Sequence, residues 1–209
     1  MLRCQRGCRW FESSHPLHLG EKMRDKTRRE RYEQKKLQAK SYPISIATVN
    51  FMHDGNLGYL IRSAACFGAQ CVHVIGSVPD RSILNPPSGG LFDYVKIIQH
   101  SSPTEFVAYA RNNDHEVVSA EISNEAESIH SYRFNFRRNN ILVVGQEETG
   151  IPIEILQNST KVLIPMPGVG FCLNTSQTAN IMLYEAVKQL ENQNKFLEDW
   201  MDGCYIHLP

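Results

Sequence analysis

The 209-residue sequence lacks the features that would place it in several large classes of protein. No apolar run approaches the ~18 residues that a membrane-spanning helix needs, and no apolar stretch follows the N-terminal arginines as in a secretory signal. The eight histidines show no ligand spacing and the six cysteines form no Cys-x-x-Cys pair, so we expect no metal site. The cysteines are scattered through apolar segments, which indicates a reducing, cytoplasmic setting.

Net charge is also absent, because 22 basic residues balance 22 acidic ones, but the two signs are unevenly distributed. Residues 1–40 hold 12 of the basic residues and only 5 of the acidic ones. We therefore expect residues 1–42 to form a basic, partly disordered extension, ahead of a folded domain at 43–201 and a tail at 202–209. The basic segment Lys22–Lys40 is the natural contact for nucleic-acid phosphates, although a solvated, charge-laced helix without a ligand explains it equally well.

The beginning of the chain allows a further interpretation. Trp10–Ser13 can be encoded by TGG-TTC-GAA-TCC, a string that contains the TTCGA core of a tRNA T-arm. Our hypothesis is that residues 1 to about 22 are translated from an upstream tRNA gene and that the true start is Met23. A short genuine tail is the alternative, and the intact mass of the natively expressed protein distinguishes the two.

Short apolar runs alternate with helix-like segments along the rest of the chain. Buried strands are expected at residues 44–49, 71–75, 94–98, 116–120, 140–144 and 161–165. Helices are expected at residues 22–40, 57–67, 104–111, 152–157 and 176–200. Gly68 suits the end of the second helix. This alternation predicts an α/β domain with a largely parallel sheet, and ligands of such sheets bind beyond the carboxyl ends of the strands.

Three separated segments carry most of the functional information. They read NLGYLIR at residues 56–62, ILVVGQEETG at 141–150 and VLIPMPG at 162–168, and the third continues to LNTS at 173–176. The last two are apolar runs that stop at a glycine-bearing loop, and the first starts a helix. In this order the segments resemble the SpoU/TrmH branch of the SPOUT methyltransferases, over roughly residues 44–190.

The resemblance implies that the chain transfers a methyl group from S-adenosylmethionine to a ribose 2′-hydroxyl of RNA. It also implies a homodimer and a deep trefoil knot, in which the C-terminal segment threads a loop and the cofactor lies inside. Several rRNA-specific members carry a separate N-terminal recognition domain, which this sequence does not show, so tRNA is favoured over rRNA as the substrate. No metal is needed for such a transfer, because orientation and electrostatics supply the catalysis.

Four residues form the expected catalytic site. Gly58 allows close backbone approach at a helix start, where free N–H groups favour an anion, and Arg62 lies on the same helical face. By the resemblance, Arg62 matches the catalytic arginine. A guanidinium is hard to deprotonate, so stabilising the developing alkoxide is a safer role than general base. Asn56 matches an asparagine that orders the site, Glu147 a glutamate that pairs with the arginine or holds its loop, and Asn174 an asparagine that holds the arginine or the substrate.

The expected cofactor-binding residues are Gly145, Ile164, Met166, Gly168 and Leu173. Gly145 ends a buried strand, where the missing side chain lets a ligand approach bare backbone. By the resemblance, Ile164, Met166 and Leu173 enclose the adenine through backbone groups and apolar contacts. Ser176 is expected to be the N-cap of the last helix.

One position departs from the family pattern. The serine that usually precedes Leu-Asn is Cys172 here, and cysteine is a much weaker hydrogen-bond partner. Together with the acidic body of the chain, Cys172 favours the alternative, a catalytically inactive knotted RNA-binding protein, whereas the intact catalytic residues favour an enzyme. An ordinary Rossmann domain is a third interpretation, disfavoured because no GxGxxG follows the first expected strand.

Overall fold

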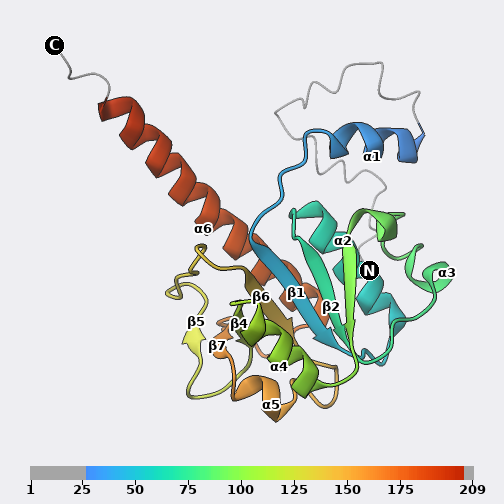
Figure 1. Ribbon diagram of the computed structural model, residues 1–209. Helices are drawn as coiled ribbons and strands as arrows, with labels where there is room; N and C mark the ends of the chain where they lie inside the picture. Colours follow the sequence, from blue (N-terminus) through green and yellow to red (C-terminus); the bar gives the residue numbers. More distant parts are fainter. Residues whose placement is uncertain (1–26, 205–209) are drawn as a thin grey trace, which may run out of the picture. The chain divides into compact units, whose positions relative to one another are not determined.

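The computed structural model (Figure 1) describes residues 27–204. By its internal contacts the chain divides into two units, Met1–Ala39 and Lys40–Pro209. The hypothesis of a false start and the expected disorder, both on residues 1–22, lie outside the described part. Within that part, no helix is both long enough and apolar enough to cross a membrane.

In the first unit the structure describes one helix, α1 (Arg28–Lys36), which is shorter than the expected segment at its C-terminal end. The helix begins with a reciprocal cap. The Thr27 side chain accepts a hydrogen bond from the Glu30 N–H at 3.3 Å, and the Glu30 carboxylate accepts one from the Thr27 N–H at 2.7 Å. Because α1 buries none of its residues, its basic side chains are presented to solvent.

The second unit is built on one seven-stranded sheet in the order β3-β2-β1-β6-β4-β7-β5. Its strands are β1 (Ile44–Val49), β2 (Cys71–Ile75), β3 (Lys96–His100), β4 (Glu116–Ala120), β5 (Glu127–Ser128), β6 (Asn140–Val144) and β7 (Thr160–Leu163). Every neighbouring pair is parallel. The expected α/β class with a parallel sheet flanked by helices is confirmed, and the knotted threading stays a prediction.

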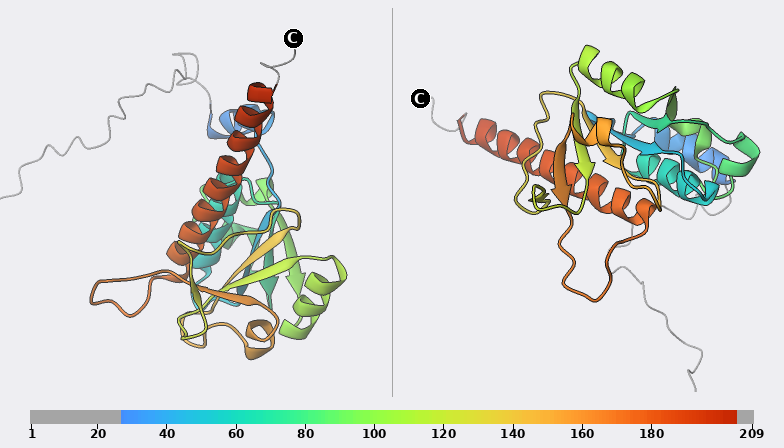
Figure 2. Two further views of the ribbon diagram at one scale, coloured as in Figure 1. Left: turned by 90° about the vertical axis from the view of Figure 1, so that its left-hand side faces the viewer. Right: turned by 90° about the horizontal axis from the view of Figure 1, so that it is seen from below.

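Helices cover both faces of this sheet, which explains why its central strands are apolar on both sides. The helices of this unit are α2 (Asp54–Cys66), α3 (Arg81–Leu84), α4 (Pro103–Asn112), α5 (Ile153–Leu156) and α6 (Thr175–Cys204). One core contains α2, α6 and one face of the sheet, and the other contains α4, α5 and the opposite face (Figure 2). The α6 residues in the first core recur at helical spacing: Ala179, Met182, Leu183 and Ala186.

Three local expectations were wrong. The third strand begins at Lys96, two residues late, because Phe92–Tyr94 first forms a 3-10 turn, η2. The second helix begins at Asp54, three residues earlier than expected, so Asn56 lies inside it and Gly58 lies beyond its first turn. The segment expected to be a plain loop after residue 80 contains the short helix α3. In contrast, Gly68 does end α2, with a φ of 69° that suits glycine.

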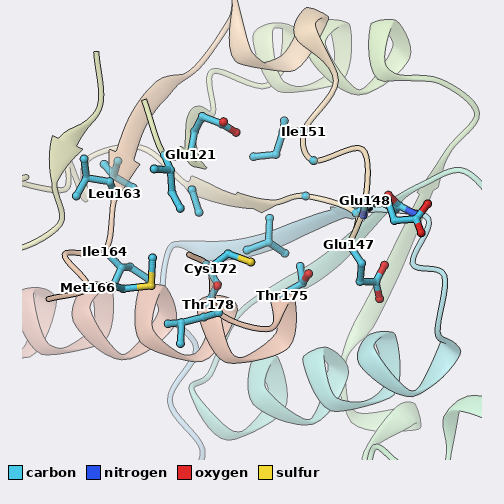
Figure 3. A pocket seen from close by; sticks show the side chains of 18 residues that line it. Glu121, Glu147, Glu148, Ile151, Leu163, Ile164, Met166, Cys172, Thr175 and Thr178 are labelled. Atoms are coloured by element: carbon cyan, nitrogen blue, oxygen red, sulfur yellow. Dashed lines mark hydrogen bonds between the residues drawn. The ribbon is translucent and has the colours of Figure 1, made fainter. Parts of the chain in front are cut away.

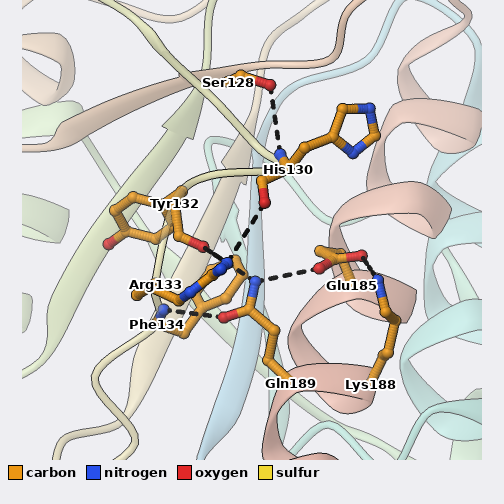
Figure 4. A network of polar contacts seen from close by, with 8 residues as sticks. All are labelled: Ser128, His130, Tyr132, Arg133, Phe134, Glu185, Lys188 and Gln189. Carbon is orange, nitrogen blue, oxygen red and sulfur yellow. Dashed lines mark hydrogen bonds and ion pairs between the residues drawn. The ribbon is translucent and has the colours of Figure 1, made fainter.

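No strand or helix was expected in the polar segment between β4 and β6, yet a buried side chain of α6 holds it in place (Figure 4). The Gln189 amide donates to the Tyr132 carbonyl at 3.0 Å and accepts from the Phe134 N–H at 3.2 Å. It also donates to Glu185 at 3.1 Å, and Glu185 pairs with Lys188 at 2.9 Å. Gln189 therefore satisfies the Phe134 N–H and, together with Arg133 at 3.4 Å, the Tyr132 carbonyl.

A chain of buried polar side chains crosses β2 and β3 beneath α4. The His73 ring lies 3.2 Å from the Cys71 sulfur through Nε2 and 2.9 Å from His100 Nε2 through Nδ1. Both histidines are buried. Burial is the main cause that lowers the pKa of His73 to about 3, with His100 next, and burial also lowers the pKa of His100. Both rings are therefore neutral at ordinary pH, and they are core residues, as expected for a histidine without ligand spacing.

Candidate active site

A cavity of about 270 Å³ opens at the carboxyl ends of three neighbouring strands, β6, β4 and β7 (Figure 3). We call it the strand-end pocket. It is lined by Ala120, Glu121, Ile122, Val144, Gly145, Gln146, Glu147, Glu148, Gly150, Ile151, Val162, Leu163, Ile164, Met166, Cys172, Leu173, Thr175 and Thr178. This is the edge at which parallel sheets bind their ligands.

Four of the five expected cofactor-binding residues line this pocket: Gly145, Ile164, Met166 and Leu173. Gly168 does not, and a Cβ built on it would meet no atom within 4 Å. The contribution of β4, which ends at Ala120 and brings Glu121 to the pocket, was not predicted. The signal was available, because a strand at 116–120 was expected and its carboxyl end shares the same sheet edge.

The loop after β6 closes on its own backbone. A Cβ on Gly145 would lie 2.6 Å from the carbonyl carbon of Gly150, so glycine is required for this approach. Gln146 and Gly150 exchange two backbone hydrogen bonds of 3.0 Å. The Gln146 side-chain oxygen also accepts from the N–H groups of Glu148 and Thr149, at 2.8 and 2.6 Å. The glycine thus makes the loop compact in addition to leaving room for a ligand.

Three of the four expected catalytic residues are joined by hydrogen bonds. The Asn56 amide donates to Glu147 at 2.5 Å, and the Asn174 amide donates to the Asn56 side-chain oxygen at 3.2 Å. The second Glu147 oxygen accepts from the Met52 N–H at 2.9 Å. Burial by itself raises the pKa of Glu147, but these backbone and side-chain donors outweigh it and lower the pKa below its ordinary value. The carboxylate is therefore ionised at neutral pH.

Asn174 also begins α6. Its side-chain oxygen accepts hydrogen bonds from the Ser176 N–H at 2.9 Å and the Ser176 hydroxyl at 2.7 Å. The N-cap is therefore Asn174, and the expectation that Ser176 caps the helix was wrong. Because capping fixes its oxygen, the Asn174 amide group is aimed at Asn56.

Arg62 stands apart from this chain of hydrogen bonds. Among the described residues, no carboxylate lies within ion-pair distance of it, so Glu147 holds its loop and does not pair with the arginine. A Cβ on Gly89 would lie 3.6 Å from the guanidinium carbon, which places the charge beside the Gly89 backbone.

Gly58 lies one helical turn before Arg62, and a Cβ on it would collide with the Pro87 side chain at 2.3 Å. Gly58 therefore admits the 86–90 loop against α2, and the expected anion site at a helix start is not formed there.

A second cavity, of about 590 Å³, surrounds Arg62 between α2 and α6. We call it the arginine pocket. It is lined by Asn56, Tyr59, Arg62, Ser63, Cys66, Phe67, Asn174, Ser176, Gln177 and Asn180. Asn56 and Asn174 line this pocket, whereas Glu147, their partner in the hydrogen-bond chain, lines the strand-end pocket. The chain Glu147–Asn56–Asn174 thus links the two cavities.

The two pockets differ in charge. Among the described residues lining the strand-end pocket, the charged side chains are Glu121, Glu147 and Glu148, and none is basic. Among those lining the arginine pocket, Arg62 carries the only full charge. The first pocket therefore favours a cationic ligand and the second an anionic one.

Residues 43–184 match the model of the SpoU rRNA Methylase family. The chain belongs to this family. A member from Escherichia coli (strain K12), a tRNA (guanosine(18)-2′-O)-methyltransferase, is 26% identical over 145 residues, which is 69% of this chain and 62% of that protein. The match thus spans less than two thirds of that relative.

Two solved structures of similar proteins agree in fold. The A. aeolicus TrmH/SpoU tRNA modifying enzyme has a TM-score of 0.69 at 22% identity, covering 79% of this chain and 85% of that one. An AdoMet-bound rRNA methyltransferase from Sinorhizobium meliloti has a TM-score of 0.65 at 23% identity, covering 71% and 59% of the two chains. The SpoU fold therefore holds in this chain.

Proposed function

We propose that this protein transfers a methyl group from S-adenosylmethionine (AdoMet) to a ribose 2′-hydroxyl of RNA. The observation that carries the proposal is the pair of oppositely charged pockets linked by Glu147, Asn56 and Asn174. Such a transfer needs a site for a sulfonium donor and a site for a polyanionic acceptor, next to each other. Membership of the SpoU family and the activity of the E. coli relative support the same reaction.

The strand-end pocket fits AdoMet by its chemistry. Its apolar wall (Ile122, Leu163 and Ile164) suits the adenine, and its net negative charge suits the positive sulfonium and amino group. When bound, AdoMet supplies an electrophilic methyl group on sulfur. We assign Gly145, Ile164, Met166 and Leu173 to this site, and we place Gly168 in the loop beside it and not in contact.

Arg62 would act on the acceptor. Its guanidinium would bind the adjacent RNA phosphate and stabilise the negative charge that develops on the 2′-oxygen. The 2′-hydroxyl proton would pass to solvent water, and the methyl–sulfur bond would break as the O–C bond forms, leaving a neutral thioether. Asn56 and Asn174 hold fixed positions through Glu147 and the α6 cap, so they orient the ribose. Because the Glu147 carboxylate already accepts hydrogen bonds from the Met52 N–H and the Asn56 amide, it maintains this order and is not a free base.

We propose tRNA as the favoured substrate, with the exposed basic helix α1 as an additional phosphate contact.

We also propose a homodimer. Ile181 and Tyr184 support it, because they remain exposed on α6 outside its buried stripe. A cytoplasmic setting is consistent with the free thiols Cys66, Cys71 and Cys172.

The deciding experiment is methyl transfer from labelled AdoMet to unmodified total tRNA and rRNA, followed by nucleoside mass spectrometry. We expect a new 2′-O-methylnucleoside in the tRNA fraction. AdoMet binding without any transfer would instead favour the inactive RNA-binding alternative, to which the substitution of Cys172 for serine points. A Cys172→Ser variant that gains activity would identify that residue as the cause.

A further inference from the structure

The exposed face of α2 carries an aromatic side chain that the proposed reaction does not use. Tyr59 lies one turn after Asn56 and one turn before Arg62, so the three side chains form a stripe along the helix. Its neighbours Leu60 and Ile61 are buried in the core, whereas Tyr59 is 51% exposed. The tyrosine ring therefore belongs to the arginine pocket and not to the core.

The Tyr59 ring is available for a ligand. It makes no ring contact with another aromatic side chain of the described residues, although Phe67 in the same pocket packs against Tyr184 at 6.4 Å between ring centres. About half of the Tyr59 side chain is thus exposed to water in the pocket that also holds the Arg62 guanidinium. Aromatic faces left in this way next to a guanidinium are used to stack nucleobases in single-stranded nucleic-acid sites.

The opposite wall of the pocket carries amides. Gln177 and Asn180 lie one turn apart on α6, and both are exposed. An amide offers both a donor and an acceptor, which is the chemistry that reads the edge of a base. With Arg62 for the phosphate and Tyr59 for the base face, the pocket provides a partner for each part of one nucleotide.

We propose that the arginine pocket holds a single unpaired nucleotide of the RNA, with its base stacked on Tyr59 and its edge facing Gln177 and Asn180. The proposal rests on the proposed function and names the form of its substrate. A base inside a duplex could not reach the Tyr59 face, so the target is a loop nucleotide or one that is flipped out. Tyr59 is thus a positioning residue that brings the ribose beside Arg62.

Substitutions that separate stacking from apolar contact test this role. Tyr59→Leu keeps apolar volume but removes the aromatic face, and we expect kcat/KM for RNA to decrease about tenfold to a hundredfold. Tyr59→Phe keeps the face and is expected to stay within about twofold, with KM for AdoMet unchanged in both. Ile153→Ala is the matched control, because it removes an exposed apolar side chain of α5, outside the arginine pocket.

A binding measurement tests the inference without requiring transfer. A short single-stranded RNA containing one 2-aminopurine reports stacking as fluorescence quenching. Tyr59→Leu should weaken binding of this RNA and reduce its quenching, and an abasic site at the same position should remove the difference between the variant and the wild type.

The outcomes separate the two proposals. If the wild type transfers methyl groups and Tyr59→Leu equals it in transfer and quenching, the stacking role is wrong while the proposed function stands. If Tyr59→Leu instead converts a dimer to monomers by sedimentation, Tyr59 is an interface residue and the inference is overturned. If the wild type neither transfers nor binds AdoMet, the proposed function fails, and quenching that depends on Tyr59 would still support the nucleotide site.

Discussion

At the scale of single residues, Arg62 combines a position in an open pocket with a charge that no carboxylate of the described residues pairs with. We predict that Arg62→Ala lowers the rate of methyl transfer by about a hundredfold to a thousandfold or more, because the developing alkoxide loses its cation. AdoMet affinity should stay within about twofold, since Arg62 does not line the strand-end pocket. Single-turnover transfer and calorimetric AdoMet binding measure the two quantities.

The control for this prediction is Arg137→Ala. Arg137 is also exposed and lies just before β6, at the amino end of the strands. Its removal should leave the transfer rate unchanged. Equal decreases of transfer and AdoMet affinity in Arg62→Ala would show that the arginine maintains the structure and does not act on the substrate.

Another residue-scale prediction concerns His73 and pH. The ring has a pKa of about 3 in the folded protein and an ordinary value of 6.5 in the unfolded chain, so the unfolded state binds more protons between these limits. Stability is therefore fully present above about pH 6.5 and decreases as the pH falls towards 3, by up to about 1.4 kcal/mol per pH unit for this histidine.

Denaturant unfolding from about pH 7.5 to about pH 5 checks the sign and the size of this slope. The His73→Gln variant should be less stable at neutral pH, because glutamine cannot reproduce the packing of the buried ring, but its stability should depend less on pH. The exposed His53 provides the control, and His53→Gln should keep the wild-type slope. A wild-type slope that survives in His73→Gln would contradict the assignment.

At the scale of elements, Gln189 joins α6 to the segment between β4 and β6. Gln189→Ala leaves the Phe134 N–H buried without this partner and leaves the Tyr132 carbonyl with only the long hydrogen bond from Arg133, at 3.4 Å. Since a buried group left without a partner costs roughly 1–3 kcal/mol, we expect the free energy of unfolding to decrease by about 2 kcal/mol. Lys188→Ala, one position away, removes a half-exposed cation from Glu185, which keeps its hydrogen bond from Gln189, and should cost about 1 kcal/mol. Similar costs for the two variants would contradict the bracing role.

The same segment shows how far the sequence could be used. Strands composed mainly of apolar residues, such as 44–49, 71–75 and 140–144, were predicted with the bounds that the structure has. The segment 121–139 was not, because its structure depends on Gln189 and on the pairing of β5 with β7, and neither leaves a local pattern. The spacing of apolar residues indicates which side of one helix or strand is buried. It does not indicate contacts with residues far along the chain.

The candidate site was predictable to the same degree. The strand-end rule located the pocket, and the resemblance supplied Arg62, Asn56, Glu147 and Asn174. The pairing within this set was open in the sequence, where Glu147 was a possible partner of Arg62, because Asn56 and Glu147 are 91 positions apart. The cap was assigned to Ser176 because a serine and an asparagine two residues apart are equally good helix starts.

At the scale of the whole molecule, the basic N-terminal segment should add affinity without specificity. Removing residues 1–40 should weaken RNA binding and reduce the slope of log affinity against log salt by roughly 0.9 for each duplex phosphate that the segment neutralises in the full chain. AdoMet affinity should not change. Filter binding at several salt concentrations measures the slope.

A charge variant in the full chain provides the matched control for this truncation. Replacing Arg28, Arg29 and Arg31 by glutamine removes three charges of α1 while keeping its length. Its salt slope should lie between those of the wild type and the truncated protein. Unaltered RNA affinity in both variants would refute the role of the basic segment.

The order of the strands in the parallel sheet also affects folding during synthesis of the chain. The central strand β1 pairs with β2 and with β6, and about 90 residues separate the end of β1 from the start of β6. At roughly 5–20 residues per second, a ribosome needs on the order of 5–20 s to supply that partner. Throughout this interval one edge of an apolar strand is unpaired, and no hairpin is available to cover it. Yield in cells should therefore depend on the speed of translation and on chaperones more than on the stability of the finished protein.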